Sequence, residues 1–385
     1  MGPFSNTIAG RICDGDAHGA VISRRGDLKI VLGGLKTAAP CRKLVKILLL
    51  QLKRIGDLIL TTPAVAALRE SFPGAQLTIV VSSECANLLP AVPNVDRTLM
   101  ARRNPRDLAL FFSVAASRFD CCIDFTRNDR SAFLALLSGA RERVVSYRVH
   151  QQAKMRARAY TDFVPIRMRD VHTIDYNLAL LEPLGIQTVA SRAPCLHLPQ
   201  MAHERADALR RDSKITRPYV ILHPGSSRRE KLWEPERWAE VIDHFGRNND
   251  IDLVLTSGPS PNEQAHIAAI KNKVQQQIVD LSGKTNLLTL AALITQSQLL
   301  VTVDSAPMHL AAATRTPQVV LFGPTNPFHW RPRESPALIL QGESAAPVTA
   351  FVPAQPRFAM SQISTGTVIN AMDSLLSHRA AAQSS

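Results

Sequence analysis

The sequence predicts an α/β protein made of two Rossmann-like, doubly wound domains. Short apolar runs alternate with amphipathic helical stretches along most of the chain, the pattern of a parallel sheet covered by helices. At 385 residues the chain has room for two such domains, since one domain takes about 100–200 residues. Several runs end in turns of glycine, proline or polar residues. In doubly wound folds, turns at the carboxyl ends of strands are where ligands bind.

The N-terminal domain is expected at residues 43–200, after a poorly ordered extension at 1–42 that lacks clear periodicity. The stretch LVKILLL at 44–50 is a continuous apolar run typical of a central parallel strand. A helix is expected to begin near Asp57 and to stop at Pro73-Gly74. The remaining elements of this half are predicted as strands at 76–81, 121–125 and 144–145 and as helices at 130–138 and 170–184.

The C-terminal domain is expected at residues 218–345, after a polar stretch with scattered prolines at 190–217 that we interpret as a linker. A tail at 346–385 closes the chain. The strands of this half are predicted at 219–222, 251–255, 277–280, 299–303 and 318–322, and its helices at 235–245, 287–295, near 307–313 and, in the tail, at 363–376.

The chain is strongly basic, with 45 Lys and Arg against 32 Asp and Glu and a net charge of +13. Between residues 97 and 169 we count 15 basic against 6 acidic residues. A basic surface favours acidic partners such as nucleic acid, anionic lipid headgroups or phosphorylated substrates, although it can also be a merely solvated face. Nucleic acid is disfavoured, because aromatic residues make up only 5% of the chain and no known binding module is present.

The sequence shows neither a stretch long enough to span a membrane nor a secretory signal. Its longest apolar runs fall well short of the ~20 residues that span a bilayer, and the first ten residues show no secretory signal pattern. The six cysteines form no C-x-x-C pair and no metal-binding spacing. We therefore expect reduced thiols in a cytoplasmic protein, with no bound metal and no cofactor.

The first of three notable turns follows the strand at 44–50 and contains Arg54, Gly56 and Asp57. Glycine lets the backbone approach a ligand closely. The carboxylate of Asp57, at the start of a helix, is stabilised as an anion and remains competent as a base. The alternative is that Asp57 only caps the helix.

The second turn, His223-Pro-Gly-Ser226-Ser227, carries hydroxyls and free N–H groups that suit a phosphate, with Lys231 and Trp233 just downstream. Lys231 would add a cation, or is simply a surface lysine.

The third turn runs from Asp304 to His309 and opens a helix, where free N–H groups and the helix dipole attract anions. Asp304 and Ser305 are good capping residues, and Pro307 suits the first helical turn. Asp304 could accept a sugar hydroxyl. His309 is either part of this site or a histidine satisfied within the core.

Four ordered motifs carry a family resemblance, namely KILLLQLKRIGDLILTTPA from Lys46, HPGS with K-x-W at 231–233, SGKTNL at 282–287, and DSAPMHLAAA with LFGPTNP through Pro327. Together they resemble glycosyltransferase family 9, which includes the lipopolysaccharide heptosyltransferases. The D-S-A-P-M-H and K-x-W forms are most similar to the third heptosyltransferase of core assembly. The resemblance extends over residues 44–375, and residues 1–42 match nothing in the family.

The resemblance implies a GT-B fold and an inverting transfer of heptose from ADP-heptose to the inner core of lipopolysaccharide. Asp57 matches the residue proposed as catalytic base, with Arg54 and Gly56 on the acceptor side. Asp280 falls where some members place an acidic residue near the nucleoside. The segments that bind the donor and its phosphates in the family correspond to Ser226, Ser227, Lys231, Asp304, Ser305, Ala306 and His309. Ala306 stands where many members have glycine.

The resemblance also implies two partners besides the donor. The basic region at 97–169 fits a phosphorylated, acidic lipopolysaccharide acceptor, and it fits peripheral contact with the anionic inner face of the inner membrane. No specific acceptor motif is present in that region.

Other functions remain as alternatives. A P-loop nucleotidase is disfavoured because Ile278 replaces the first glycine ahead of Gly283-Lys284-Thr285, and a dehydrogenase because no G-x-G-x-x-G follows a strand. A transferase for another nucleotide sugar and acidic glycan remains open, as does a sugar-nucleotide epimerase of the same fold. A non-catalytic lipid- or nucleotide-binding protein would not need Asp57, Lys231, Asp304 and His309 together.

Overall fold

The computed structural model describes residues 46–102 and 104–384, with the side chains of 378–384 excepted. The extension predicted at 1–42, two cysteines (Cys13 and Cys41) and the first two residues of the strand predicted at 44–50 lie outside this part. Contacts group residues 42–385 into one unit. The domain boundaries near 200, 218 and 345 stay predictions.

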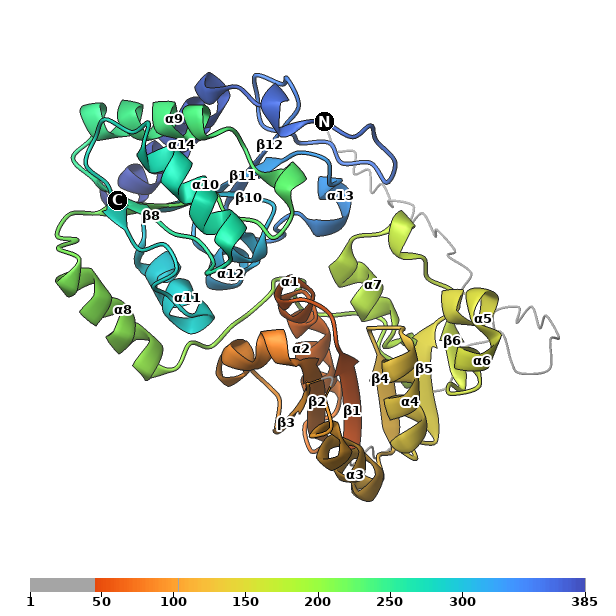
Figure 1. Cartoon of the computed structure of the whole chain (residues 1–385). Helices are drawn as coiled ribbons and strands as arrows, with labels where there is room; N and C mark the ends of the chain where they lie inside the picture. Colours follow the sequence, from red (N-terminus) through yellow and green to blue (C-terminus); the bar gives the residue numbers. More distant parts are fainter. Residues whose placement is uncertain (1–45, 103, 385) are drawn as a thin grey trace, which may run out of the picture. The chain divides into compact units, whose positions relative to one another are not determined.

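Two six-stranded sheets form the centre of the protein, and within each sheet every neighbouring pair of strands is parallel (Figure 1). The order in the first sheet is β3-β2-β1-β4-β5-β6, and the second, β12-β11-β10-β7-β8-β9, repeats it when read from β9. The strands of the first sheet are β1 Lys46–Gln51, β2 Gln76–Ser82, β3 Arg97–Ala101, β4 Cys121–Asp124, β5 Glu142–Ser146 and β6 Asp162–Val164. Those of the second are β7 Tyr219–His223, β8 Asp252–Leu255, β9 Val279–Asp280, β10 Leu299–Val303, β11 Gln318–Phe322 and β12 Ala337–Gln341.

Helices cover both faces of the first sheet. Side chains alternate along β1, so Ile47 and Leu49 pack with α1 and α2 on one face while Leu48 and Leu50 pack with α3 and α4 on the other. All four are fully buried, which explains the unbroken apolar run at this position. The helices of this part are α1 Ile55–Ile59, α2 Thr62–Ser71, α3 Asp107–Ser117, α4 Asp129–Leu137, α5 Arg148–Gln152, α6 Lys154–Ala157 and α7 Thr173–Ala179, with 3₁₀ turns at Ser83–Ala91, Met168–Asp170 and Glu182–Leu184.

The single helix expected from Asp57 is wrong in two respects. It begins two residues earlier, at Ile55, and it is divided into α1 and α2. Pro63 lies in the first turn of α2, where its missing N–H needs no partner, and a proline at this point cannot continue the hydrogen-bonding ladder of a preceding helix. Thr61 joins the two helices, and its hydroxyl donates to the carbonyl of Asp57 over 2.8 Å. The helix predicted at 170–184 is likewise shorter, ending at Ala179 before a 3₁₀ turn.

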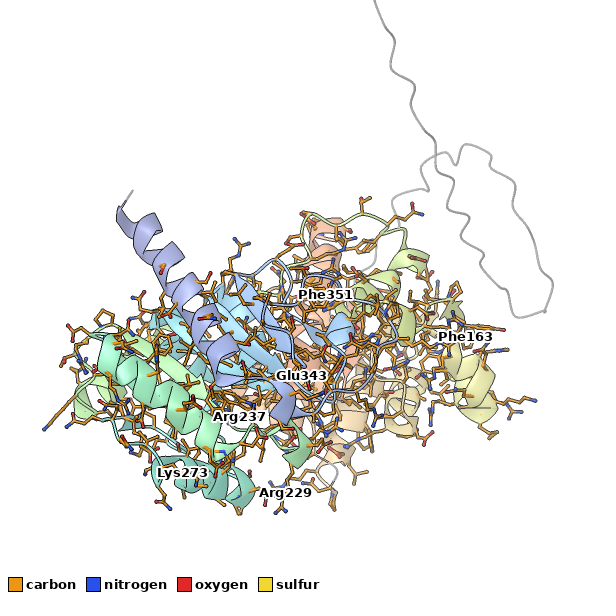
Figure 2. All side chains as sticks on the ribbon, turned by 90° about the horizontal axis from the view of Figure 1, so that it is seen from above. Phe163, Arg229, Arg237, Lys273, Glu343 and Phe351 are labelled. Atoms are coloured by element: carbon orange, nitrogen blue, oxygen red, sulfur yellow. The ribbon has the colours of Figure 1, made fainter. Side chains whose placement is uncertain are left out.

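The second sheet is covered by α8 Gln200–Asp212, α9 Pro235–Asn248, α10 Pro261–Lys271, α11 Leu287–Gln296, α12 Ala306–Thr314, α13 Pro327–Trp330 and α14 Thr365–Ser384, with 3₁₀ turns at Arg229–Lys231 and Met360–Gln362. The closing helix is longer than the predicted 363–376. Trp233 and Arg237 both donate to the carbonyl of Ile363, which ties the start of α14 to α9 (Figure 2).

The interpretation of 190–217 as a linker is wrong, because thirteen of its residues form α8. The buried stripe of this helix consists of small side chains, Ala202 and Ala206 one turn apart, so its amphipathic pattern lacks large apolar residues. Arg210 lies over the ring of Tyr219, 5.2 Å from its centroid. Within residues 46–102 and 104–384, no helix is both long and apolar enough to cross a bilayer.

Candidate active site

The three predicted turns lie at the points where the strand order of each sheet reverses. In the first sheet this point lies between β1 and β4, and in the second between β7 and β10. Open parallel sheets bind ligands at the carboxyl ends of the strands that flank such a point. The turn of Gly56 follows β1, the turn of Ser226 follows β7, and Asp304 follows β10.

Asp57 occupies the first turn of α1 but does not cap it. The cap position belongs to the exposed Arg54, in extended conformation. The Asp57 side chain is 16% exposed, and its Oδ1 lies 3.8 Å from Nζ of Lys53. Burial lowers the pKa of Lys53, and the negative charge of Asp57 partly offsets that effect. The carboxylate of Asp57 is thus half-buried, and its separation from Lys53 is longer than a direct hydrogen bond.

Gly56 lies directly against the imidazole of His309. A Cβ added to Gly56 would lie 2.5 Å from Cδ2 of His309 and 2.8 Å from its Nε2, far inside van der Waals contact. Glycine is therefore required here by close approach, and the contact joins α1 to α12. The structure in this way brings together the first and third turns, 253 positions apart in sequence from Gly56 to His309.

His309 is buried, but it is not a satisfied core histidine. Its Nδ1 has no hydrogen-bond partner among the described residues. Burial lowers the pKa of His309, against the raising effects of the carboxylates of Asp304 and Asp57. The fold therefore leaves one buried nitrogen of this ring without a hydrogen bond among the described residues.

Lys231 forms an ion pair with Asp304. Its Nζ lies 2.5 Å from Oδ2 of Asp304 and also donates to the Asp304 carbonyl over 3.2 Å. The side chains are only 13% and 8% exposed, so Lys231 is not a surface lysine. The second and third turns, predicted separately, meet through this pair.

Small polar groups surround the Lys231–Asp304 pair. Ser226 is buried and its hydroxyl accepts from the N–H of Arg228 over 3.3 Å, whereas Ser227 is exposed. Ser305 caps α12 by position, and its hydroxyl lies 3.3 Å from that of Thr302 rather than on the helix N–H groups. Ala306 is the first residue of α12, so the N–H groups of this turn remain a potential anion site.

Asp280 is not brought to these residues. It ends β9, the edge strand of the second sheet, two strands away from β7. Its Oδ2 accepts from Lys271 over 2.5 Å and its Oδ1 from the N–H of Ser282 over 3.0 Å. Partial burial would raise the pKa of Asp280, but the hydrogen bonds from Lys271 and Ser282 outweigh it and hold the pKa below its usual value.

Residues 108–350 match the family model described as glycosyltransferase family 9 (heptosyltransferase). The chain belongs to this glycosyltransferase family. The family predicted from the sequence motifs is confirmed.

Individual relatives agree. The chain is 29% identical to lipopolysaccharide heptosyltransferase 3 of Escherichia coli over 287 residues, which cover 72% of this chain and 83% of the relative. Its fold is similar to the family 9 glycosyltransferase of Veillonella parvula, with a TM-score of 0.77, 24% identity and coverage of 88% and 99% of the two chains. The ADP-heptose lipopolysaccharide heptosyltransferase II of Escherichia coli gives a TM-score of 0.70 at 22% identity, with coverage of 87% and 99%. The fold of this family 9 glycosyltransferase is GT-B, as predicted.

The sequence interpretation did not single out Glu263, whose carboxylate reaches the turn that follows β7. Its carboxylate lies against two glycines that follow β7 and β8, since a Cβ on Gly225 or on Gly258 would lie 2.5 Å from one of its oxygens. Ser260 caps α10 by accepting from the N–H of Glu263, and its hydroxyl donates to Glu263 over 2.8 Å. The S-x-x-E spacing at the start of α10 was the available signal.

Arg127 of the glycosyltransferase was missed as well. It follows β4 in a left-handed conformation, with φ of 68°, and its guanidinium lies 4.9 Å from the ring centroid of Tyr176. Its buried Nε has no partner among the described residues. Its charge also contributes to lowering the pKa of Lys53, so the guanidinium of Arg127 and the ammonium of Lys53 are near each other.

Asp124, fully buried at the end of β4, shapes this turn by accepting from Ser131 and Tyr160 and from the N–H groups of Thr126 and Arg127. Burial raises the pKa of Asp124 despite these hydrogen bonds. Arg127 lies three positions after the end of β4, which was a signal available in the sequence, but the ring over which it stacks, Tyr176, lies far along the chain.

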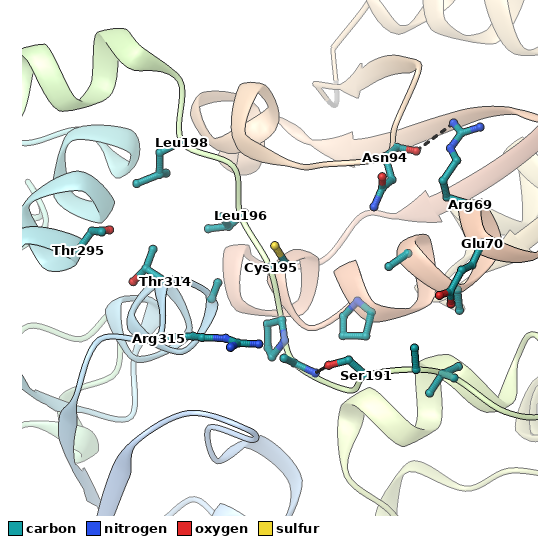
Figure 3. Close-up of a pocket in the computed structure, with 18 of the residues that line it drawn as sticks. Arg69, Glu70, Asn94, Ser191, Cys195, Leu196, Leu198, Thr295, Thr314 and Arg315 are labelled. Atoms are coloured by element: carbon teal, nitrogen blue, oxygen red, sulfur yellow. Dashed lines mark hydrogen bonds between the residues drawn. The ribbon is translucent and has the colours of Figure 1, made fainter. Parts of the chain in front are cut away.

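A separate cavity of about 660 Å³ lies elsewhere in the glycosyltransferase (Figure 3). It is lined by α2, by the segment around Cys195 that precedes α8, and by the end of α12 at Arg315. Neither Asp57 nor Lys231 contributes to it. Cys195 and the three other described cysteines are free thiols. Within the described chain, no group of three or more His, Cys, Asp or Glu side chains is placed to hold a metal ion.

Proposed function

We propose that this family 9 glycosyltransferase moves a heptose from ADP-heptose to the inner core of lipopolysaccharide, with inversion and with Asp57 as general base. The observation that carries the proposal is the contact between Gly56 and His309. It places the carboxylate that follows β1 next to the segment that follows β10, where the family motifs expect the donor. The names of the relatives support the donor and acceptor classes.

The proposed reaction is a single displacement at the anomeric carbon. Asp57 takes the proton of the acceptor hydroxyl as its oxygen attacks the face of the sugar opposite the leaving group. A new C–O bond forms while the bond from the anomeric carbon to the ADP oxygen breaks. The electron pair leaves with ADP, whose growing negative charge is met by Lys231, the hydroxyls of Ser226 and Ser227, and the N–H groups at the start of α12.

Donor binding requires the Lys231–Asp304 pair to open. The diphosphate would replace Asp304 as the partner of Lys231, and Asp304 would then accept a hydroxyl of the sugar, with His309 Nδ1 and the Ser305-Ala306 turn alongside. Glu263, placed beside the Ser226 turn, is the better candidate for a ribose hydroxyl. Asp280 is the weaker one, because its oxygens already accept from Lys271 and Ser282.

The acceptor side is proposed to be the β1–β4 edge of the first sheet. Lys53 lies beside Asp57, Arg127 is near Lys53, and Arg54 is exposed at the cap of α1. These groups suit an acceptor that carries carboxylates or phosphates near the reacting hydroxyl. Such an acceptor is anchored in lipid, so the proposal includes peripheral contact with the anionic inner face of the membrane.

The test is a transfer assay with the full chain. ADP-heptose and sugars on other nucleotides are offered one at a time with truncated lipopolysaccharide cores, and products are read by mass spectrometry. We expect one heptose added to one class of core, with release of ADP and an inverted anomeric configuration by NMR. Transfer from a different nucleotide sugar, a retained configuration, or change of the donor without any acceptor would contradict the proposal.

A further inference from the structure

Exposed large apolar side chains are concentrated on three neighbouring helices of the first sheet. The described residues include Met201 and Val352 as isolated examples, whereas the other five lie on α3, α4 and α6. We name these five the apolar patch. Its members, with their exposed fractions, are Leu108 (63%), Phe112 (77%), Phe133 (46%), Leu136 (57%) and Met155 (75%).

The three helices that carry the patch contact one another. Leu108 and Phe112 are one turn apart on α3 and therefore share a face. Phe111 of α3 meets Phe133 of α4 edge to face, with centroids 5.2 Å apart. The α6 residue Arg156 holds the start of α4 through Asp129, over 2.7 Å. In Figure 1, α4 lies beside β4 and β5, and α5 and α6 lie beside β6.

Core packing does not account for this exposure. The inward faces of α3 and α4 already fill the space over the sheet with Leu110, Val114 and Leu134, which are buried. A cluster of exposed aromatic and aliphatic side chains outside a filled core marks a binding surface in soluble proteins.

The surroundings of the patch are positively charged. Arg106 and Arg118 lie at the two ends of α3, Arg141 follows α4, and Lys154 and Arg158 flank Met155. All five are exposed, and none forms an ion pair with another described residue. The acidic residues of α3 and α4 are neutralised locally, Asp107 by Arg130 and Asp129 by Arg156.

We propose that α3, α4 and α6 form the surface by which the protein docks on an anionic lipid bilayer. The apolar patch enters the boundary between headgroups and acyl chains, and the five cations lie at the level of the negative headgroups. The surface extends the membrane contact of the proposed function and rests on that function only for the presence of such a bilayer. A second copy of the chain fits less well, because a symmetric contact would bring the same basic rims together.

The position of this surface suits catalysis on a lipid-anchored acceptor. Of the helices of the patch, α3 and α4 pack on the face of β1 formed by Leu48 and Leu50, whereas α1 and α2 pack on the opposite face. The carboxyl edge that carries Asp57 lies between the two faces. The docking surface lies close to that edge, since Arg156 of α6 donates to the carbonyl of Arg127, in the turn after β4, over 2.9 Å.

Vesicle flotation of the full chain tests the surface. Vesicles of phosphatidylethanolamine and phosphatidylglycerol are compared with vesicles of phosphatidylcholine alone. We expect binding to the anionic vesicles, and a loss of at least about 10-fold in affinity for the double variant F112S/L136S. R118Q/K154Q/R158Q should lose a similar amount at low salt, and this loss should shrink as added salt screens the charges. The control M201S/V352S removes two exposed apolar groups outside the patch and should bind as the wild type does.

Two further measurements separate the outcomes. Turnover of F112S/L136S on a water-soluble acceptor should be unchanged, so a failure of the transfer assay and a failure of vesicle binding are distinguishable. Equal vesicle binding by the wild type and both patch variants would overturn the proposal. So would light scattering that shows a dimer for the wild type and a monomer for F112S/L136S without vesicle binding, since the patch would then be an interface between copies.

Discussion

The two sheets have one topology and different chemistry. Each is six-stranded, wholly parallel and reverses its order at the same place, between the first and fourth strands of its own sequence. Topology alone therefore creates two equivalent ligand edges. The difference lies in the turns. After β1 and β4 stand a half-buried carboxylate and two cations, whereas after β7 and β10 stand hydroxyls, a helix start and a tight ion pair.

This difference indicates how two edges of the same topology can take different roles in one transfer reaction. Asp57 keeps a 3.8 Å contact with Lys53, so its carboxylate is available to a second molecule. Asp304 is bonded at 2.5 Å to Lys231, so that edge is neutralised until an anion competes for the lysine. On this comparison the first edge supplies a base and the second receives a leaving anion.

Removing the base should have the largest effect. Asp57→Asn keeps the shape of the side chain and removes its basicity, so we expect kcat to fall by about 10²–10⁴-fold, the usual contribution of general base catalysis. ADP affinity by calorimetry should stay within about 2-fold, because the nucleotide belongs to the other edge. Glu70→Gln, an exposed carboxylate on α2, is the control. Loss of ADP binding, or turnover near that of the wild type, would show that the two edges are not divided in this way.

Lys231→Ala tests the second edge. A charge-assisted hydrogen bond contributes about 1.5–3 kcal/mol, so ADP affinity should fall roughly 10- to 100-fold while the acceptor KM stays unchanged. Lys271→Ala is the matched control, because Lys271 forms a 2.5 Å ion pair with Asp280 at the sheet edge. If Lys271→Ala lowers ADP affinity as strongly as Lys231→Ala does, the nucleoside lies near Asp280. The ADP site would then have to be extended to β9.

Much of this arrangement can be predicted from the sequence, and the reasons for the remainder are physical. The central strands are unbroken apolar runs, and each of the three turns directly follows one, so both could be predicted locally. The pairing of Lys231 with Asp304 could not, because it joins residues 73 positions apart through the packing of β7 beside β10. The helix α8 was missed because alanines form its buried stripe. Glu263 was missed because it reaches this edge from α10, through the space left by two glycines.

The contact between the two edges can itself be tested with Gly56→Ala. The new methyl would meet the His309 ring at 2.5 Å, so the ring or α1 must shift. We expect about 1–3 kcal/mol lower stability, as for overpacking generally, and kcat/KM reduced by about 10-fold. Gly74→Ala is the control, since an added Cβ there meets nothing within 4 Å. The double variant G56A/H309A should recover the stability lost by Gly56→Ala, and additive losses would argue against the contact.

The smallest expected effect is a loss of folding stability at acidic pH, to which both halves of the protein contribute. Burial lowers the pKa of His172, in the first half, to about 3, and that of His223, in the second, to about 4. His172 Nδ1 accepts from the N–H of Ile174, so protonation would break that bond. Both rings are neutral when folded at pH 5 but charged when unfolded, so each should cost about 2 kcal/mol of stability between pH 6.5 and 5. Urea unfolding at pH 7 and pH 5 measures this loss, and His172→Asn should reduce it by about 2 kcal/mol. An unchanged pH dependence in that variant would assign the sensitivity to the second half of the protein alone.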